Sequence, residues 1–441
     1  MGILPNILFV LALILGIGYF TRNIRKIIRN IRLGRTADVT GPSAERWKNM
    51  ARIALGQQKM VVRPVSGFLH IIVYLGFIII NIEVLEIIID GVFGTHRIFS
   101  FMGGFYDFLI GSFEILALLV IIAVVLFWIR RNVLRLQRFW KPEMKGWPKK
   151  DADLILYIEV ILMALFLTMN AADFRLQEMG VEHYNQAGAF PVSSYIAGWM
   201  SGWSETTLIA VERVAWWLHI LGILFFLNYL YFSKHLHILL AFPNTYFGRL
   251  KPQGQFDNLE AVKKEVALMM DPNADPFAPP AEDAPPPEKF GASDVMDLNQ
   301  IQLLNAYTCT ECGRCTSECP ANQTGKKLSP RKIMMDTRDR LEEVGRHLDT
   351  HNGQWEPDGK QLLDDYISRE ELWACTSCNA CVEACPVSID PLSIILDMRR
   401  YLVMEQSAAP SELNVMMSNI ENNGAPWPFN QMDRLNWKDE N

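Results

Sequence analysis

The sequence predicts an all-α protein, in which a five-helix transmembrane bundle precedes a cytoplasmic α-helical domain that holds all the cysteines. Five long apolar stretches lie in the first 240 of its 441 residues, and all eight cysteines lie between Cys309 and Cys385. Charge divides the chain in the same way, because residues 1–240 have a net charge of +7 and residues 241–441 a net charge of −13. This distribution leaves no surface-wide positive field, which argues against nucleic acid as a partner.

The five apolar stretches are each close to the roughly 20 residues that a helix needs to cross a bilayer core. A single stretch of this kind could be a buried core helix, but five within 240 residues are hard to bury in a soluble domain. The first stretch differs from a signal peptide, because its basic residues follow it and no small-residue cleavage site does. We therefore expect five spans, at residues 3–20, 66–89, 106–128, 154–170 and 207–232.

Loop charge predicts how the spans are oriented in a cytoplasmic (inner) membrane. Residues 21–65 and 129–153 carry 11 and eight basic side chains, whereas residues 91–105 and 171–206 carry one each. Loops rich in lysine and arginine stay in the cytoplasm. The N-terminus is therefore expected outside and, because the number of spans is odd, the C-terminal half is expected in the cytoplasm.

Several histidines lie where the spans predict cofactor ligands. His70 is near the cytoplasmic start of the second span, His219 inside the fifth, and His237 at the cytoplasmic end of the fifth. A b haem bound by two histidines needs such a pair from facing helices, so His70 and His237 predict a haem. His219 precedes His237 by 18 residues, which is five helical turns, or about 27 Å along one face, and suits a second site. The alternative is contact with lipid head groups, which we prefer for His235.

These histidines give residues 1–240 a resemblance to the gamma subunit of respiratory nitrate reductase, a five-helix cytochrome b with two haems. The matching features are His70, then His219 and His237, with Phe232-Ser233-Lys234 before the last. The resemblance implies a haem held by His70 and His237.

The ligand partner of His219 departs from that family. In that family the second span carries two histidines ten residues apart. This chain has His70 at the first position but Ile80 at the second. His96 or His183 in the outer loops could replace it. One or two b haems are therefore expected.

The spans also hold ionisable side chains, which are costly in a membrane and for that reason suggest a function. They fit a proton path or a quinone pocket towards the outer face, and they fit equally well ion pairs that only tie helices together. The residues are Glu83, Glu86, Glu114, Glu212 and Arg213, with Glu159 nearer the inner face.

The cysteines form two runs with identical spacing, C-x2-C-x2-C-x3-C-P, which is the bacterial ferredoxin pattern for [4Fe–4S] clusters. In that pattern the fourth cysteine of each run ligates the cluster of the other run. Disulfides do not suit a cytoplasmic domain, and structural zinc would need only pairs of C-x2-C. One cluster is expected on Cys309, Cys312, Cys315 and Cys385, and the other on Cys375, Cys378, Cys381 and Cys319.

Residues 293–405 resemble α-helical ferredoxin domains, such as those in the C subunits of heterodisulfide reductase and of anaerobic glycerol-3-phosphate dehydrogenase, and in the iron–sulfur subunit of succinate dehydrogenase. The two cysteine runs carry the resemblance, together with helical patterning at residues 330–344, 359–374 and 390–406. Many membrane-bound relatives continue into paired Cys-Cys-Gly motifs that bind a catalytic cluster. This chain has none, so the resemblance implies that a separate subunit supplies that module.

Composition predicts four parts. Residues 1–240 form the membrane part, and residues 241–292 a polar linker, of which the Pro/Ala-rich stretch 271–292 cannot build a core. Residues 293–405 form the dicluster domain. Residues 406–441 form a polar tail that is either disordered or docks on a partner.

These features predict an oxidoreductase subunit for electron transport in a respiratory chain. Electrons would pass between a soluble partner, a flavoprotein or a Cys-Cys-Gly-type subunit, and menaquinone or ubiquinone in the membrane. The carriers would be the two clusters and b haem, and the same parts serve either direction of flow. The alternative is a haem-free membrane anchor with a ferredoxin-like docking domain. A cluster-based redox sensor is disfavoured, because no DNA-binding stripe is evident.

Overall fold

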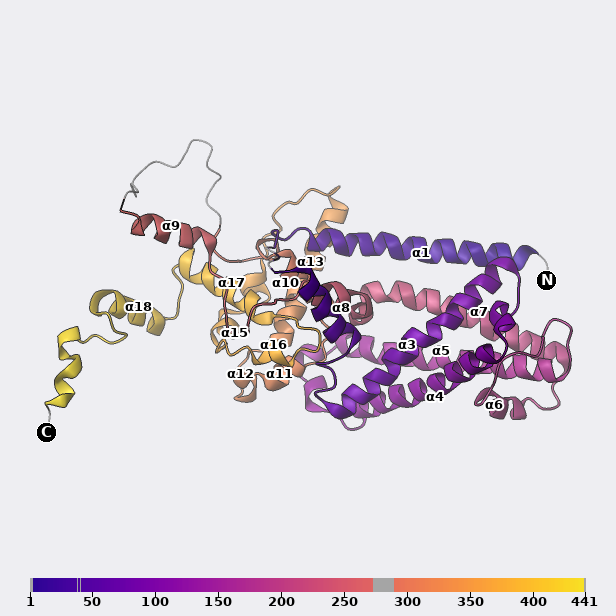
Figure 1. Ribbon diagram of the computed structural model, residues 1–441. Coiled ribbons are helices and arrows are strands. Elements are labelled where there is room, and N and C mark those ends of the chain that lie inside the picture. The colour runs from indigo at the N-terminus through magenta and orange to yellow at the C-terminus, as the bar shows by residue number, and fades with distance from the viewer. Residues whose placement is uncertain (1–2, 38, 40, 273–288, 440–441) are drawn as a thin grey trace.

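The computed structural model of the protein describes residues 3–37, 39, 41–272 and 289–439. Five long helices run along one axis, and shorter helices gather at one end of them (Figure 1). Each of the five is long and apolar enough to cross a membrane. The described residues form no strand and only two isolated bridges, which confirms the all-α prediction. The long helices are α1 (Ile3–Ile31), α3 (Pro64–Phe93), α4 (Gly104–Asn132), α5 (Trp147–Glu178) and α7 (Glu205–Tyr229).

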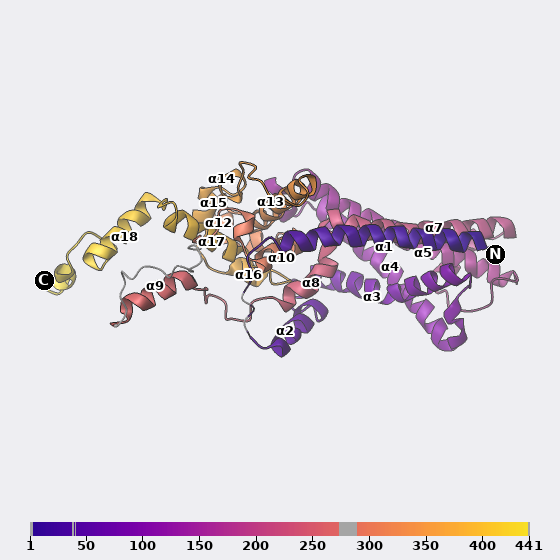
Figure 2. The same cartoon turned by 90° about the horizontal axis from the view of Figure 1, so that it is seen from above.

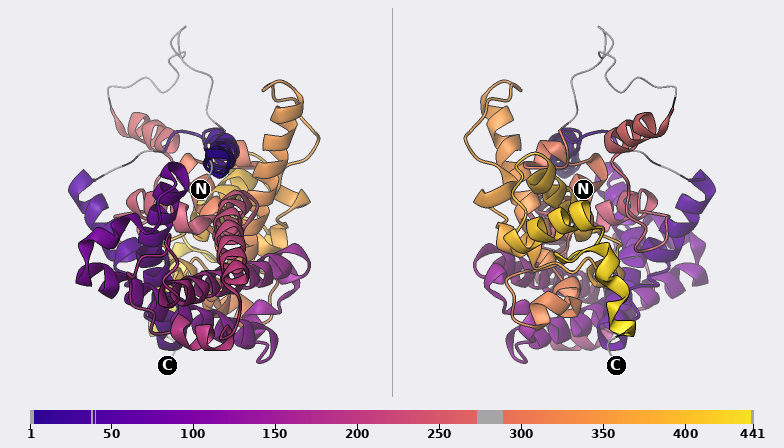
Figure 3. Two further views of the ribbon diagram at one scale, coloured as in Figure 1. Left: turned by 90° about the vertical axis from the view of Figure 1, so that its right-hand side faces the viewer. Right: turned by 90° about the vertical axis from the view of Figure 1, so that its left-hand side faces the viewer.

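The two ends of the bundle carry different segments (Figures 1 and 2). The end where α1 begins, called the distal end below, carries η2 (Ile98–Met102) and α6 (Ser193–Trp199). The opposite, proximal end carries the cysteine-bearing region, which lies in front of the bundle in the right-hand view of Figure 3. The proximal connections also include α2 (Ser43–Met50), η1 (Ala51–Leu55), η3 (Gln137–Phe139) and η4 (Pro142–Met144).

Helix α1 extends well past the predicted span, because its basic second half packs on the cysteine-bearing region. The Asn30 side chain donates a hydrogen bond to the Tyr307 hydroxyl (2.9 Å), and Arg29 donates to the carbonyl of Gly345 (2.9 Å). A side chain at Gly345 would collide with Asn30, so glycine permits this close approach. Ile27 of α1 belongs to the same hydrophobic core as the cysteine-bearing helices.

The fifth span ends before His237, so the prediction that His219 and His237 share one helical face is wrong. After α7 and η5 (Leu230–Phe232), Ser233 is extended (φ −118°, ψ 145°). η6 (Lys234–Leu236) follows, and α8 (His237–Tyr246) begins a new direction. The physical reason is tertiary: Asp151 on α5 accepts hydrogen bonds from the Lys234 backbone N–H (3.2 Å) and the Tyr229 hydroxyl, which holds the chain out of the helix.

Short helices surround the cysteines. The expected helix at 330–344 is α13 (Pro330–Thr350), which starts on proline behind the capping residue Ser329, and that at 390–406 is α17 (Pro391–Met404), capped by Asp390. The other helices are η7 (Val295–Asp297), α10 (Gln300–Thr308), α11 (Arg314–Glu318), α12 (Pro320–Gln323), α14 (Leu362–Asp365), α15 (Arg369–Trp373) and α16 (Ala380–Ala384).

The helix predicted at 359–374 is wrong in its first half. Leu363 has extended backbone angles (φ −73°, ψ 134°) and Asp364 is left-handed (φ 71°). The backbone N–H of Leu363 donates to the carbonyl of Ser293 (2.9 Å), and that of Leu362 donates to the Asp294 side chain (3.1 Å). These non-local bonds take the N–H groups that a helix would have used.

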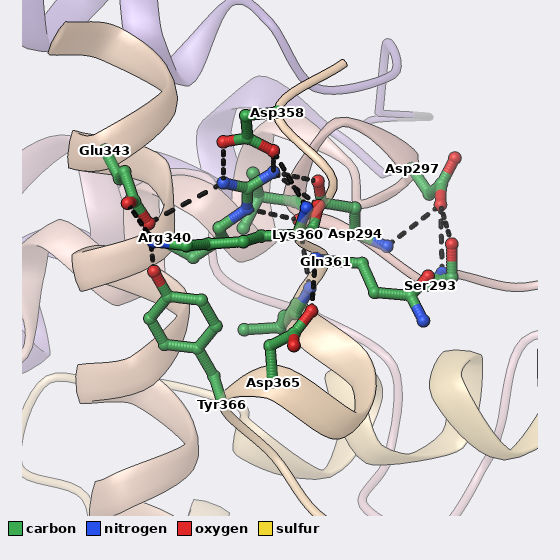
Figure 4. A network of polar contacts seen from close by, with 12 residues as sticks. Ser293, Asp294, Asp297, Arg340, Glu343, Asp358, Lys360, Gln361, Asp365 and Tyr366 are labelled. Carbon is green, nitrogen blue, oxygen red and sulfur yellow. Dashed lines mark hydrogen bonds and ion pairs between the residues drawn. The ribbon is translucent and has the colours of Figure 1, made fainter. Parts of the chain in front are cut away.

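Arg340, in the middle of α13, binds the segment at Asp294 and the segment at residues 358–360 (Figure 4). Its guanidinium, fully buried, donates to both carboxylate oxygens of Asp294 (3.0 and 2.8 Å) and to both of Asp358 (2.6 and 3.0 Å). A fifth bond reaches the carbonyl of Lys360 (2.8 Å). Arginine suits this position because its planar fork can bind two carboxylates at once.

The predicted linker and tail are only partly described. α9 (Glu260–Met270) precedes the Pro/Ala-rich stretch, most of which, at 273–288, lies outside the described residues. The described part of the tail contains two helices, α18 (Ser411–Asn423) and η8 (Gln431–Lys438), and extends away from the bundle (Figure 1).

Candidate functional site

The two cysteine runs have the same local backbone. In each run the residue before the second cysteine (Glu311 or Ser377) and the residue after it (Gly313 or Asn379) have a φ between 55° and 70°. This left-handed conformation bends the chain tightly around the cysteines. At Gly313 a side chain would also collide with the guanidinium of Arg331, so glycine is needed there.

The first predicted set of ligands lies around one cavity between the two runs. Cys381, which belongs to the second predicted set, also borders it, as do Arg331 and Pro386. The four cysteines of the first set are Cys309, Cys312, Cys315 and Cys385.

The second predicted set is also close together. The thiols of Cys375 and Cys381 each interact electrostatically with those of Cys319 and Cys378. Cys319 and Cys381 are buried, whereas Cys378 is exposed. The second set therefore has an opening to solvent.

The chemistry of these donors fits iron–sulfur clusters. All eight thiols are free, and burial raises the pKa of Cys309 to about 12 and that of Cys385 to about 11. Binding of a metal releases the protons of such thiols, because only the thiolate ligates. Backbone N–H groups also point at sulfur, from Ser377 to Cys375 (3.4 Å) and from Ile389 to Cys385 (3.3 Å). The assignment of each cysteine to a cluster stays a prediction.

Glu311, between the first two cysteines, binds the proximal end of the bundle. Its carboxylate is 3% exposed, pairs with Lys234 of η6 and accepts a hydrogen bond from Arg338 of α13 (2.9 Å). Burial alone would raise the pKa of Glu311, but Lys234 and Arg338 outweigh it and hold the pKa below its usual range. Lys234 also donates to the carbonyl of Pro148 (2.6 Å), so the contact reaches α5.

Arg314, between the second and third cysteines, binds the segment that leads into α3. Its guanidinium donates to the carbonyls of Lys59 (3.2 Å) and Met60 (3.3 Å) and to the hydroxyl of Ser66 (3.3 Å). Ser66 lies one turn before His70, which is close enough to Arg314 for the two side chains to interact electrostatically. The first run is therefore held against the residues that precede both His70 and His237.

Three histidines gather at the proximal end. His70 and His237 are close enough to interact electrostatically, and the rings of His235 and His237 lie 5.2 Å apart. Among the described residues, the buried Nδ1 of His70 has no hydrogen-bond partner, and the Nδ1 of His237 faces the carbonyl of Lys234 (3.3 Å). A carbonyl at Nδ1 leaves Nε2 free for a metal, which fits an axial haem ligand. His235, expected at lipid head groups, instead lies 3.7 Å from the carboxylate of Glu159, with 17% of its side chain exposed.

His219 lies apart from the other histidines, buried in the middle of α7. Its Nδ1 faces the carbonyl of Leu162 (3.0 Å), and its ring is 6.0 Å from that of Phe166. The substitutes considered for its partner, His96 and His183, pair with each other at the distal end, with ring centres 5.2 Å apart. No contact joins either of them to His219 among the interactions found in the described residues.

The distal end holds a buried polar network around Arg97, the one basic residue of its loop. The guanidinium binds Asp173, the hydroxyl of Tyr106 (3.1 Å) and the side-chain oxygen of Asn170 (3.0 Å). The Tyr106 hydroxyl in turn donates to Glu86 (2.8 Å). Sequence reasoning counted Arg97 only as a loop charge. Its isolation in an otherwise uncharged loop was the available signal.

The remaining predicted carboxylates join this network or lie beside it. Glu114 accepts from Asn170 (3.2 Å) and from two backbone N–H groups at the start of α6 (2.9 and 3.0 Å). Glu212 pairs with Arg213 and accepts from the hydroxyl of Tyr184 (3.1 Å). A cavity of about 270 Å³ opens among these groups and is lined by Glu83, Glu86, Glu212 and Arg213, but not by Glu114.

Known proteins are similar to the cysteine-bearing region and to most of the chain. Residues 308–389 match the family described as a 4Fe-4S dicluster domain, which supports iron–sulfur clusters as cofactors. The chain is 30% identical over 463 residues to the probable iron-sulfur-binding oxidoreductase FadF of Bacillus subtilis, covering 98% of this chain and 61% of that protein. It is 26% identical over 412 residues to the EtfAB:quinone oxidoreductase of Syntrophomonas wolfei, covering 88% and 53%.

A third relative matches a shorter part of the chain. The C subunit of the ferredoxin/F(420)H(2)-dependent CoB-CoM heterodisulfide reductase of Methanosarcina acetivorans is 31% identical over 120 residues, covering 27% of this chain and 60% of that protein. The chain thus spans less than two thirds of the length of each of these relatives. No solved structure matches it. The predicted likeness to heterodisulfide-reductase-type iron–sulfur proteins is confirmed, whereas the cytochrome b likeness stays a prediction.

Proposed function

We propose that this chain is the electron-transfer subunit of a membrane quinone oxidoreductase. It carries electrons between a soluble cytoplasmic redox partner and menaquinone or ubiquinone in the membrane. One observation carries the proposal: Glu311 and Arg314, which stand between the cysteines of the first run, contact the residues that precede His237 and His70. Such contacts keep iron–sulfur ligands and candidate haem ligands side by side, as electron transfer between them requires.

Two [4Fe–4S] clusters and b haem are the proposed cofactors. Cys309, Cys312, Cys315 and Cys385 would hold one cluster, Cys375, Cys378, Cys381 and Cys319 the other, and His70 with His237 the haem. When bound, these groups supply one-electron transfer. The chain's own side chains hold them in place: Arg314 and Glu311 join the first run to the bundle, and the Lys234 carbonyl orients the His237 ring.

The soluble partner is proposed to be an electron-transfer flavoprotein. The name of the Syntrophomonas relative, EtfAB:quinone oxidoreductase, supports this choice, and the quinone in that name supports the membrane substrate. A partner protein with Cys-Cys-Gly motifs is the other possibility, which the heterodisulfide reductase relative favours. The exposed Cys378 supports access of either partner to the second predicted set of cysteines.

The proposed arrangement has residues 1–240 in the cytoplasmic membrane with the N-terminus outside. The cysteine-bearing part, residues 293–405, then lies in the cytoplasm behind the linker 241–292, and residues 406–441 form a tail. The basic residues of the proximal loops support this orientation.

The test is a reduced-minus-oxidised spectrum of the purified full-length protein, combined with iron and acid-labile sulfide analysis. We expect a b-haem α band, iron for two clusters, and reoxidation of the dithionite-reduced protein by decylubiquinone. His70→Ala should lose the α band and keep the sulfide, whereas His351→Ala, an exposed residue of the cysteine-bearing region, should keep both. A protein with clusters and no α band would replace this proposal with the haem-free membrane anchor.

A further inference from the structure

The distal cavity is built from charged and aromatic side chains of four long helices. Its polar side is formed by α3, α5 and α7, with Glu83, Glu86, Asp173 and Glu212. Its apolar side includes Phe9 of α1 and two tryptophans of α7. With about 270 Å³ and its position among membrane-spanning helices, it can take the planar head of a lipid-soluble molecule.

Most of the acids at this end are already paired. Glu86 accepts from Tyr106 and from a backbone N–H, Glu212 from Tyr184 and Arg213, and Asp173 from Arg97. These bonds tie α3, α4, α5 and α7 to one another and to the distal loops. The ion-pair explanation offered by the sequence therefore accounts for them.

Glu83 is the exception. Its side chain is 3% exposed and lines the cavity, yet its Oε2 has no hydrogen-bond partner. Among the described residues it is the one carboxylate with a buried oxygen left in this state. A buried polar atom without a partner costs roughly 1–3 kcal/mol, and Glu83 interacts with Arg97 only through its charge, so the hydrogen bonds of this end do not account for Glu83.

The aromatic wall suits a flat ring. Trp216 and Trp217 lie with ring centres 5.3 Å apart, and Phe9 lies 5.2 Å from Trp216 and 5.9 Å from Trp217. The three rings meet tilted or edge to face, with 44° to 79° between their planes, so together they form an apolar aromatic surface against which another planar ring can pack. A quinone combines a planar ring with two carbonyl oxygens that must exchange protons, and the cavity offers both a ring surface and an acid.

We infer that the distal cavity binds the head group of the membrane quinone and that Glu83 exchanges the proton with one of its carbonyl oxygens. This inference rests on the proposed function. Reduction takes two electrons and two protons, so that each carbonyl oxygen becomes a hydroxyl. The electrons come from the soluble reductant, one proton comes from Glu83, and the other enters through the cavity, which His96 also lines.

After it gives up its proton, Glu83 can be protonated again from the distal surface along its own helix. Glu86 and Asp90 follow it at three and seven residues, which places the three carboxylates on one face of α3, and all three line the cavity. Asp90 accepts hydrogen bonds from the side chain of Thr95 and the backbone of Arg97 (2.7 Å) at the end of the bundle. Quinol oxidation would use the same path in reverse.

The experiment compares Glu83→Gln with the wild type. Full-length protein with its cofactors is reduced with stoichiometric dithionite and mixed with decylubiquinone in a stopped-flow instrument. Gln keeps the size of the side chain but cannot carry the proton, and general acid catalysis commonly contributes about 10²-fold or more. We expect reoxidation to slow by about 10²-fold, and Glu83→Asp to recover part of the rate. Glu182→Gln, an exposed change at the same end, should leave it unchanged.

Two further measurements separate this inference from its premise. Spectra and reduction potentials of the cofactors should match in Glu83→Gln and wild type, and an azido-quinone should label wild-type peptides that contain residues 86–97 or 212–217. A wild-type protein that decylubiquinone does not reoxidise would refute both the proposed function and the inference. Normal wild-type turnover, with Glu83→Gln within about twofold of it or with label only elsewhere, would refute the inference alone.

Discussion

Replacing Glu311 by Gln should loosen the cysteine-bearing region from the bundle. Glu311 is buried and bound to two cations, Lys234 and Arg338, which come from opposite sides of the contact. Gln keeps the shape but removes the charge, so Lys234 retains only Asp151 (3.8 Å) and one carbonyl as partners. The change leaves buried cations partly uncompensated.

The expected size follows from the burial of the pair. Removing one partner of a buried ion pair costs roughly 3–5 kcal/mol. At about 1.4 kcal/mol per factor of ten, a loss of about 3 kcal/mol raises the equilibrium constant for local opening by roughly 100-fold. Glu318→Gln is the matched control, because its pair with Arg63 (2.6 Å) is half exposed and such surface pairs contribute about 0–1 kcal/mol.

Hydrogen–deuterium exchange of the holoprotein measures this opening. Peptides spanning 229–246 and 309–318 should exchange roughly 100-fold faster in Glu311→Gln and at most about fivefold faster in Glu318→Gln. Iron and sulfide content should be equal in both, so that cofactor loss is not the cause. Equal exchange in the two variants would refute the reasoning that the buried pair holds the contact.

Three other outcomes are expected. Because the pKa of Glu311 is lowered, the carboxylate stabilises the contact fully at any pH above 4.5, the ordinary pKa of glutamate, and this stabilisation is lost as the pH falls below that value. Hydrogen–deuterium exchange of residues 309–318, corrected for intrinsic rates, should therefore rise at acid pH in the wild type but not in Glu311→Gln. Arg340→Met should destabilise the cysteine-bearing region by roughly 3–5 kcal/mol, because it strands two carboxylates, and Arg340→Lys should recover only part of this in denaturant titrations. Cys319→Ser should remove the cluster assigned to Cys375 and about half the iron, while the electron paramagnetic resonance signal of the other cluster remains; loss of both signals together would contradict the assignment.

Several elements were predictable because their signals are local. The five apolar runs became five long helices, and the helices at 330–344 and 390–406 formed behind the capping residues Ser329 and Asp390. The spacing of the cysteines was sufficient to expect two groups of thiols from crossed runs. Predictions failed where the backbone bonds to a distant segment, as at Leu363 with Ser293 and at Lys234 with Asp151.

The candidate site, too, was predictable where its signals are local and not where it depends on distant residues. The placement of histidines and carboxylates in apolar spans identified them as candidates. It did not show which of them would have hydrogen-bond or ion-pair partners. Tyr106 and Tyr184, from other parts of the chain, donate hydrogen bonds to Glu86 and Glu212. No such donor reaches Oε2 of Glu83 among the described residues. Arg97 acquires its role only when α3 and α5 bring Asp173 to it.

By itself, the amino-acid sequence determined the helical class, the membrane-spanning segments and the two cysteine runs, because hydrophobic length and ligand spacing are properties of short stretches. Only the tertiary structure decided how the parts meet. It paired Glu311 with Lys234, ended the fifth span before His237, and left Glu83 unpaired beside the distal cavity. The reason is that burial and electrostatic pairing depend on distances between residues far apart in the chain, which no local pattern encodes.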